Sequence, residues 1–293
     1  MHKNKNTIKE PGSYRIFQIF NNFFLVLLAV ICVAPFVHIL AVSFSDAAST
    51  AAGSVGFLPI GFQLDAYKYI IEQGTALRAF GITILRMILG TSWSMLLTIS
   101  AAYPLSLNEK ELPGRKFFVV FFFITMVFSG GIIPYYILMK DLKLIDTIWA
   151  LVLGGVPVGN AILLMNFFRT LPHTIYESAS LDGASHFTIL TQIYLPLAKP
   201  SIATLSLFCL VGHWNDWYGG LVYMQDVSRY PLQTFIYNAM QSTSSTSDSW
   251  SGAAPRQAVT AALICLSIIP IIVAFPVLQK HIKTGLVIGS VKE

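Results

Sequence analysis

Six apolar stretches, each long enough to cross a lipid bilayer, constrain this chain more than any other feature. A bilayer core about 30 Å thick takes roughly 20 apolar residues of helix. The stretches are continuous rather than alternating, which excludes a transmembrane β-barrel. The first is also too long for the apolar core of a cleaved signal peptide. We therefore expect an all-α, polytopic membrane protein with six transmembrane helices at 23–42, 79–107, 117–139, 147–168, 201–223 and 258–279.

The composition excludes other classes of protein. Of the 293 residues, 55% are hydrophobic and only 11% are charged. A soluble domain is about 25% charged, and a disordered chain is poor in apolar residues and rich in charge. The formal net charge of +5 does not indicate nucleic acid, because no Lys/Arg-rich run with interleaved aromatic residues occurs.

The distribution of charge predicts the topology. Loops and tails on one side of the predicted spans hold twelve Lys and Arg residues, whereas the other side holds six. Since cytoplasmic loops carry the excess of Lys and Arg, we expect both termini in the cytoplasm. The predicted organisation is an N-terminal cytoplasmic segment 1–22, a six-helix domain 23–279 with a cytoplasmic loop at 169–200, and a cytoplasmic tail 280–293. The external loop 224–257 contains a polar stretch that is either a solvated loop or a docking surface.

The cytoplasmic loop 169–200 predicts a short helix with defined ends. Thr174 and Glu177 match the S/T-x-x-E capping box, so we expect a helix from about residue 175 to 181. The helix should end at Gly183, because glycine tolerates the positive φ of a helix stop.

A second short helix should follow that turn. It is expected to start at Ser185 and to run until Pro196 and Pro200 return the chain to the membrane. Small side chains around the turn give it a low profile that can lie in a groove of another protein. These small residues are Ser178, Ala179, Ser180, Gly183 and Ala184.

The loop resembles the EAA motif of binding-protein-dependent ABC importer permeases. Its spacing matches EAA-x3-G-x9-I-x-LP through Ile193, Leu195 and Pro196, with Ser178 in place of the central alanine. The longer form E-x-A-x-x-D-G-A is also met, through Asp182 and Ala184. Other stretches are similar to the carbohydrate-uptake, maltose-type branch, including permeases for oligosaccharides and for acidic polymers such as alginate. They lie at 112–116, 128–134, 213–217, 231–233 and 285–293.

The resemblance implies a type I ABC importer permease fold, and it implies that transport and ATP hydrolysis are carried out by different subunits. A homologous second permease, two ATPase subunits and a periplasmic or extracellular solute-binding protein would be partners, in the cytoplasmic (inner) membrane of a bacterium. The chain itself would not be an enzyme and would hold no cofactor, since ATP and Mg would bind the ATPase subunits. The tail 285–293 would be a second contact with them. The loop residues that would couple to the ATPase are Glu177, Ser178, Ala179, Asp182, Gly183 and Ala184.

For Glu177 two interpretations remain open. The resemblance implies that it pairs with a basic residue in a groove of the ATPase subunit. The capping box offers a local alternative, in which the carboxylate serves only its own helix.

Five consecutive residues in the fifth predicted span are candidates for lining a sugar path. Aromatic faces stack on sugar rings, while polar groups bond hydroxyls; the alternative is helix packing or an aromatic belt at the membrane interface. The candidates are His213, Trp214, Asn215, Asp216 and Trp217.

Arg86 and Asp216 are the two charges inside the predicted spans. A charge within a membrane usually faces a cavity or a partner. The two residues are therefore candidates for an ion pair, with solvation of Asp216 at the membrane interface as the alternative.

Missing motifs narrow the function further. The sequence has no G-x4-G-K-[S/T] phosphate loop, no cluster with metal-ligand spacing and no nucleophile elbow. An ion-gradient-driven secondary transporter acting alone is the main alternative, and it should carry several carboxylates or inverted repeats in its spans. This chain has one acid there and no obvious repeat. A membrane scaffold is a third possibility, but it leaves the EAA-like loop unexplained.

Overall fold

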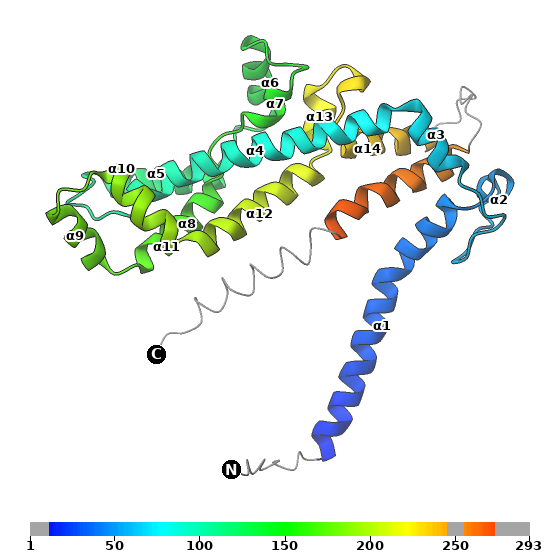
Figure 1. The fold of residues 1–293 in the computed structure, drawn as a ribbon, viewed down its shortest axis with the longest axis horizontal. Coiled ribbons are helices and arrows are strands. Elements are labelled where there is room, and N and C mark those ends of the chain that lie inside the picture. The colour runs from blue at the N-terminus through cyan, green and yellow to red at the C-terminus, as the bar shows by residue number, and fades with distance from the viewer. Residues whose placement is uncertain (1–11, 245–254, 273–293) are drawn as a thin grey trace. The chain divides into compact units, whose positions relative to one another are not determined.

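The computed structural model describes residues 12–244 and 255–272, and within these ranges the regular structure is entirely helical, as expected (Figure 1). The chain divides into two units. One comprises Met1–Tyr69 and Ser247–Cys265, and the other comprises Ile70–Thr246 and Leu266–Glu293.

The first unit contains α1 (Gly12–Ser43), α2 (Ala47–Ala51) and the start of α3 (Asp65–Gln73). The part of α1 from Ile16 to Ser43 is long and apolar enough to cross a membrane, which agrees with the first predicted span. The predicted N-terminal segment 1–22 is thus already helical from residue 12.

Polar and aromatic contacts hold the segment that follows α1. The Oγ of Ser43 lies 2.9 Å from the Tyr67 hydroxyl, and the Phe44 ring stacks on Phe62 and Tyr67 at centroid distances of 5.3 and 5.1 Å. Asp46 caps α2 by accepting a 2.7 Å hydrogen bond from the Ser49 amide. The end of α1 is thereby tied to α2 and α3.

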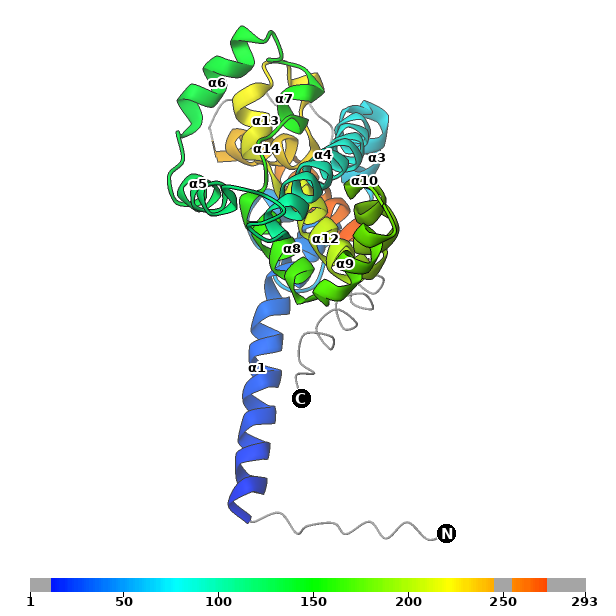
Figure 2. The ribbon, with the colours of Figure 1, turned by 90° about the vertical axis from the view of Figure 1, so that its left-hand side faces the viewer.

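The core of the second unit is α4 (Thr75–Ser106), which packs along α8 (Val158–Thr170) and α12 (Lys199–Asn215) (Figures 1 and 2). Helix α4 is also long and apolar enough to cross a membrane, in agreement with the second predicted span. Figure 1 shows α9, α10 and α11 at one end of α4, with α13 and α14 towards the other.

The third predicted span, 117–139, is wrong as a continuous helix. It consists of α5 (Arg115–Val127) and α6 (Ile132–Asp141), which meet at a bend of 104°. The connection contains Gly131, whose φ of 79° lies in the positive range that glycine adopts without strain.

The fourth predicted span, 147–168, is also interrupted. Helix α7 (Ile148–Val152) ends before a non-helical segment that contains Gly154, Gly155 and Pro157, and α8 begins at the next residue. Glycine and proline both disfavour a helix interior, so the apolar character of this stretch was not enough to make it one helix.

The fifth and sixth predicted spans are met in part. Helix α12 covers the start of 201–223, but it ends at Asn215, and a short α13 (Tyr218–Tyr223) follows. A helix at Arg256–Ile272 lies in the predicted span 258–279, whose last residues, like the predicted tail 280–293, lie outside the described ranges.

Two described helices could cross a membrane by themselves, and the number rises to four if each strongly bent pair is one span. The six predicted spans are therefore not confirmed.

The remaining elements connect these helices. Between α8 and α12 lie α9 (His173–Leu181), α10 (His186–Thr188), the π-helical turn η1 (Ile189–Tyr194) and α11 (Leu195–Leu197). After α13 come the short 3-10 turn η2 (Val227–Arg229) and α14 (Leu232–Ser244).

Helix α14 is fixed to α4 and α13 by two buried threonines. The Thr83 hydroxyl accepts a 2.7 Å bond from the Leu232 amide, and the Thr234 hydroxyl donates to the Trp217 carbonyl at 2.8 Å.

Candidate functional site

Helix α9, which carries the EAA-like residues, begins earlier than predicted and without the predicted capping box. Its first residue is His173, and its N-cap is Pro172, which makes no side-chain cap. The carboxylate of Glu177 bonds instead to the Nδ1 of His173 at 2.9 Å. The capping-box prediction is wrong because α9 already includes Thr174, so Thr174 is not the N-cap residue whose N–H a capping-box glutamate binds.

The end of α9 is a Schellman motif. Three of the EAA-like residues, Ala179, Gly183 and Ala184, form this turn. The Ala184 amide donates to the Ala179 carbonyl at 3.0 Å, and the Gly183 amide donates to the Ser180 carbonyl at 3.1 Å. Gly183 has a φ of 77°, as the sequence predicted. These two bonds satisfy carbonyls at the helix end, and the turn needs a residue that tolerates positive φ.

The other EAA-like residues lie on the surface of α9. Glu177, Ser178 and Asp182 are all exposed. The Ser178 hydroxyl donates a 2.9 Å bond to the Thr174 carbonyl of the preceding turn. Because this bond folds the hydroxyl back onto its own helix, serine can replace alanine here without enlarging the surface.

Two large apolar side chains beside these residues were missed by the sequence-based prediction. Leu181 is 88% exposed and Phe187 is 75% exposed. The sequence held no clear signal for them, because other apolar residues of the same loop, such as Ile189, are buried. Exposed apolar groups next to exposed carboxylates form a surface suited to a protein partner.

His173 connects this loop to the segment that follows α4. Its Nε2 lies 3.0 Å from a Glu111 carboxylate oxygen, while its Nδ1 faces Glu177. The side-chain amide of Asn108 is also close, at 2.7 Å from the same Nε2, and with its oxygen turned to that side it accepts from a protonated Nε2. Carboxylates only accept hydrogen bonds, so a ring bonded to both of them carries a proton on each nitrogen.

The two carboxylates also alter the acidity of His173. Partial burial by itself lowers its pKa, but the hydrogen bonds to Glu177 and Glu111 outweigh that effect and raise the pKa above its ordinary value. The sequence offered little sign of this bridge, because Glu111 and His173 are 62 residues apart.

Buried aromatic residues fix the loop to the ends of α4 and α8. Tyr194 is 7% exposed and packs edge-on against Tyr103 and Phe168, with centroid distances of 5.3 Å in each case. The Tyr103 hydroxyl lies 3.2 Å from Nδ1 of His186. The loop is thus packed against the helical core rather than suspended from it.

The second helix of the loop starts as predicted but ends differently. The Ser185 hydroxyl caps α10 by accepting a 3.2 Å bond from the Thr188 amide. The helical path then continues through η1 and α11, and an 83° bend separates it from α12. Pro196 and Pro200 do not stop a helix, because each lies in the first residues of a new one, where proline is tolerated.

The second unit also contains a polar cavity of about 360 Å³. Its wall comes from α4, α6, α7 and the connection that follows it, α12 and α13. The polar and aromatic residues that line it are Arg86, Ser94, Tyr135, His213, Asp216 and Tyr223.

Arg86 and Asp216 form the ion pair that the sequence left open. The Arg86 Nη2 bonds to the Asp216 carboxylate, and its Nη1 donates to the Asp216 carbonyl at 2.9 Å. The carboxylate also accepts a 2.9 Å bond from the Gly219 amide. Arg86 is only 3% exposed and Asp216 is 37% exposed. The pair therefore joins α4 to the break between α12 and α13.

Glycines make room for both polar groups on this wall. A Cβ on Gly219 would lie 2.6 Å from the Asp216 carboxylate, and a Cβ on Gly90 would lie 2.5 Å from the His213 ring. Neither position has space for a larger residue.

The five candidates for a sugar path separate into two groups. His213 and Asp216 line the cavity. Trp214 is 3% exposed and packs edge-on against Phe80 at 6.0 Å, whereas the Trp217 ring stacks on Tyr237 at 4.1 Å. Asn215 is exposed and is not among the lining residues. For the two tryptophans, helix packing is the observed arrangement.

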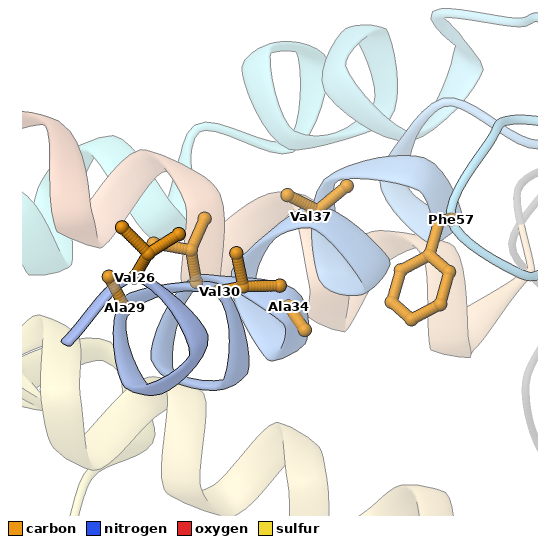
Figure 3. Close-up of a pocket in the computed structure, with 7 residues that line it drawn as sticks. Val26, Ala29, Val30, Ala34, Val37 and Phe57 are labelled. Atoms are coloured by element: carbon orange, nitrogen blue, oxygen red, sulfur yellow. The ribbon is translucent and has the colours of Figure 1, made fainter. Parts of the chain in front are cut away.

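A different surface in the first unit is entirely apolar. Side chains of α1 and Phe57 form a groove of about 500 Å³ that has almost no polar lining (Figure 3). Such a surface suits lipid or another apolar helix rather than a polar solute.

Within the described residues the chain is helical with broken spans, and discontinuous membrane helices are a feature of many transporters. Residues 116–287 match the family described as the binding-protein-dependent transport system inner membrane component, and the chain belongs to this family.

Two relatives from Bacillus subtilis (strain 168) match over almost the whole length. Protein LplC is 38% identical over 292 residues, covering 98% of each chain. The polygalacturonan/rhamnogalacturonan transport system permease protein YtcP is 36% identical over 288 residues, covering 95% of this chain and 99% of the relative.

A solved structure shares the fold. It is the crystal structure of a bacterial ABC transporter involved in the import of the acidic polysaccharide alginate, one chain of which superimposes with a TM-score of 0.85. That chain is 30% identical, and the match covers 92% of this chain and 98% of the other.

Proposed function

We propose that this chain is the membrane-spanning permease subunit of an ABC importer that moves a sugar or oligosaccharide into the cell. Support comes from the family, from relatives whose names concern carbohydrate polymers and from the loop at 169–200. The observation that carries the proposal is that Glu177, Leu181, Asp182 and Phe187 are all exposed within one short stretch of a firmly packed loop, so that it presents both carboxylates and apolar side chains. We name these four residues the coupling surface.

The coupling surface would bind a groove of an ATPase subunit. Glu177 and Asp182 would face basic residues, while Leu181 and Phe187 would enter apolar pockets, which is the helix-in-groove mode of recognition. Tyr103 and Tyr194 pack the loop against α4, and α4 also carries Arg86 of the cavity. A displacement of the loop by the ATPase would therefore act on helices that line the cavity.

The same proposal defines the partners and the orientation. A homologous second permease, two ATPase subunits and an external solute-binding protein would complete the importer in the bacterial inner membrane. ATP and Mg would bind the ATPase subunits, and this chain would carry out no catalysis. Both termini would lie in the cytoplasm, because the loops and tails on that side hold twelve Lys and Arg residues against six.

Co-purification of the complex tests the proposal. Leu181→Ser and Phe187→Ser should reduce the ATPase subunits recovered with the tagged chain, because each removes apolar surface from the interface. Val227→Ser is the matched control, since Val227 is an exposed apolar residue, at 49%, in a different loop. Recovery of a lone chain that transports without an ATPase subunit would contradict the proposal.

A secondary transporter acting alone finds less support. Ion-coupled transport relies on carboxylates within the spans that gain and lose an ion or proton. Asp216 is the acid within the predicted spans, and its carboxylate is bonded to Arg86 and the Gly219 amide.

A further inference from the structure

The cavity beside Arg86 and Asp216 has polar groups on its wall but no free positive charge. Both terminal nitrogens of Arg86 are bonded to Asp216. Each of these nitrogens has a second N–H, but the other fork of the guanidinium also needs Nε, which has no hydrogen-bond partner and exposes less than 1 Å² of surface. A carboxylate entering the cavity could not engage the guanidinium in the usual bidentate way without displacing Asp216.

Hydrogen-bonding groups for an uncharged ligand remain available. The Asp216 side chain is 37% exposed, and a carboxylate can accept more bonds than the two it accepts here, from Arg86 and the Gly219 amide. The Nε2 of His213 and the Oγ of Ser94 are 3.5 Å apart, which makes their mutual bond long and weak. Both groups can therefore turn to a ligand hydroxyl.

Two tyrosines give the cavity apolar surface as well. The rings of Tyr135 and Tyr223 meet edge-on at 5.6 Å. The Tyr135 hydroxyl is engaged by the Leu153 carbonyl at 2.5 Å, so Tyr135 offers the cavity mainly its ring. A wall of aromatic rings with a few convergent polar groups suits a sugar ring, which combines apolar C–H faces with hydroxyls.

We propose that this cavity is a subsite for one uncharged sugar ring, and that it rejects a ring bearing a carboxylate. The proposal rests on the function proposed above and narrows it. A volume of about 360 Å³ is at the small end for ligand sites and suits a single ring. A uronate ring would lose hydration, find no free cation and face the carboxylate of Asp216. An acidic oligosaccharide could occupy the subsite only through an uncharged ring in its chain.

A cysteine reporter at Gly154 can test this directly. Gly154 lines the cavity and is exposed, and a Cβ added there has no neighbour within 4 Å. Gly81→Cys on α4 is the matched control, because a Cβ there also meets nothing within 4 Å and Gly81 does not line the cavity. The variants would be assembled with their partner subunits in nanodiscs, and alkylation by N-ethylmaleimide would be followed by peptide mass spectrometry.

Three matched pairs of probes separate charge from shape: glucose and glucuronate, galactose and galacturonate, and mannose and mannuronate. Within each pair the rings differ only at C6. At least one uncharged sugar should slow the alkylation of Gly154→Cys, by about twofold at a concentration equal to its Kd. Its uronate partner should leave the rate unchanged, and Gly81→Cys should respond to neither.

Protection by a uronate as strong as that by its uncharged partner would overturn the proposal, as would the absence of protection by all three uncharged sugars. Gly212→Cys, at a second lining position with open space, repeats the measurement should Gly154→Cys fail to assemble. ATP hydrolysis of the same complexes is measured in parallel. A complex that hydrolyses ATP but shows no protection contradicts the subsite alone, whereas a chain that recruits no ATPase subunits contradicts the importer.

Discussion

The imidazole of His173 meets the carboxylate of Glu111 at 3.0 Å, although the two residues are 62 positions apart in the sequence. Its other nitrogen holds Glu177 at 2.9 Å. One ring thus joins the segment after α4 to the coupling surface. The position of the Glu177 carboxylate therefore depends on a residue that does not belong to the EAA-like motif.

The bridge should loosen as the pH rises. The hydrogen bonds that His173 donates to two carboxylates raise its pKa, so the folded state binds the proton more tightly than the unfolded state does. The stabilisation is fully present below the ordinary histidine pKa of about 6.5 and is lost as the pH rises through the raised folded value. The backbone amides of α9 should therefore lose protection from hydrogen exchange, corrected for intrinsic rates, as the pH rises through this range.

Two variants check that His173 is the titrating group. His173→Gln should abolish the pH dependence of α9 protection, and Glu111→Gln should shift its midpoint to lower pH because one carboxylate partner is lost. An unchanged pH profile in His173→Gln would rule out the bridge as its origin.

Glu177→Ala should leave the importer assembled while weakening the link between ATP hydrolysis and transport. The carboxylate is 61% exposed, so its loss removes a contact without opening a cavity. Transport per ATP hydrolysed in proteoliposomes is the measurement. Glu109→Ala, at another exposed acid, should behave as wild type. If Glu177→Ala also transports normally, the coupling role is wrong.

Gly183→Ala should destabilise the turn that ends α9. A left-handed residue with a Cβ costs about 1–2 kcal/mol, and Gly183 has a φ of 77°. The Ala184 amide, which donates to Ala179, should then exchange its proton roughly fivefold faster or more. Gly155→Ala, at a position with open space and no positive φ, should not change that rate. Equal effects of the two substitutions would refute the Schellman geometry.

Replacing Asp216 of the Arg86–Asp216 pair should reduce the stability of the protein more than replacing Arg86. Asp216→Asn leaves a 3% exposed guanidinium without its counter-charge, whereas Arg86→Met leaves a carboxylate that is 37% exposed. We expect about 3 kcal/mol or more for Asp216→Asn and a smaller loss for Arg86→Met.

Unfolding measurements in detergent on both single variants and the double variant would form the double-mutant cycle. The double variant should lose less stability than the sum of the single losses, because the two residues act on each other. Strict additivity would show that the pair does not contribute as a unit.

The predictions from sequence were most successful where a residue type is unusual for its surroundings, such as a charge within an apolar stretch. Two charges within apolar stretches pointed to the Arg86–Asp216 pair, and a glycine after a helical pattern pointed to the turn at Gly183. The predictions were least successful where the signal is nonlocal. Nothing near His173 indicates Glu111, and no local pattern tells that His213 lines a cavity while Trp214 packs against Phe80.

The continuous helices predicted at 117–139 and 147–168 failed for a physical reason. Hydropathy measures whether a segment prefers lipid, but it does not measure whether the backbone stays helical. The first stretch contains Gly131, and the second contains Gly155 and Pro157. The conformational preferences of these residues outweigh the apolar character of their neighbours. Breaks at glycine and proline are tolerated where neighbouring helices satisfy the freed backbone groups.

The exposure of Leu181 and Phe187 has a consequence for how many copies of the permease persist in the cell. A copy synthesised without ATPase subunits to cover these side chains displays, on the proposed cytoplasmic face, the kind of apolar surface that chaperones and proteases act on. The abundance of the permease would then follow that of its ATPase. Orphan copies would be degraded, and the ratio of subunits in the membrane would be set after synthesis rather than by matched expression.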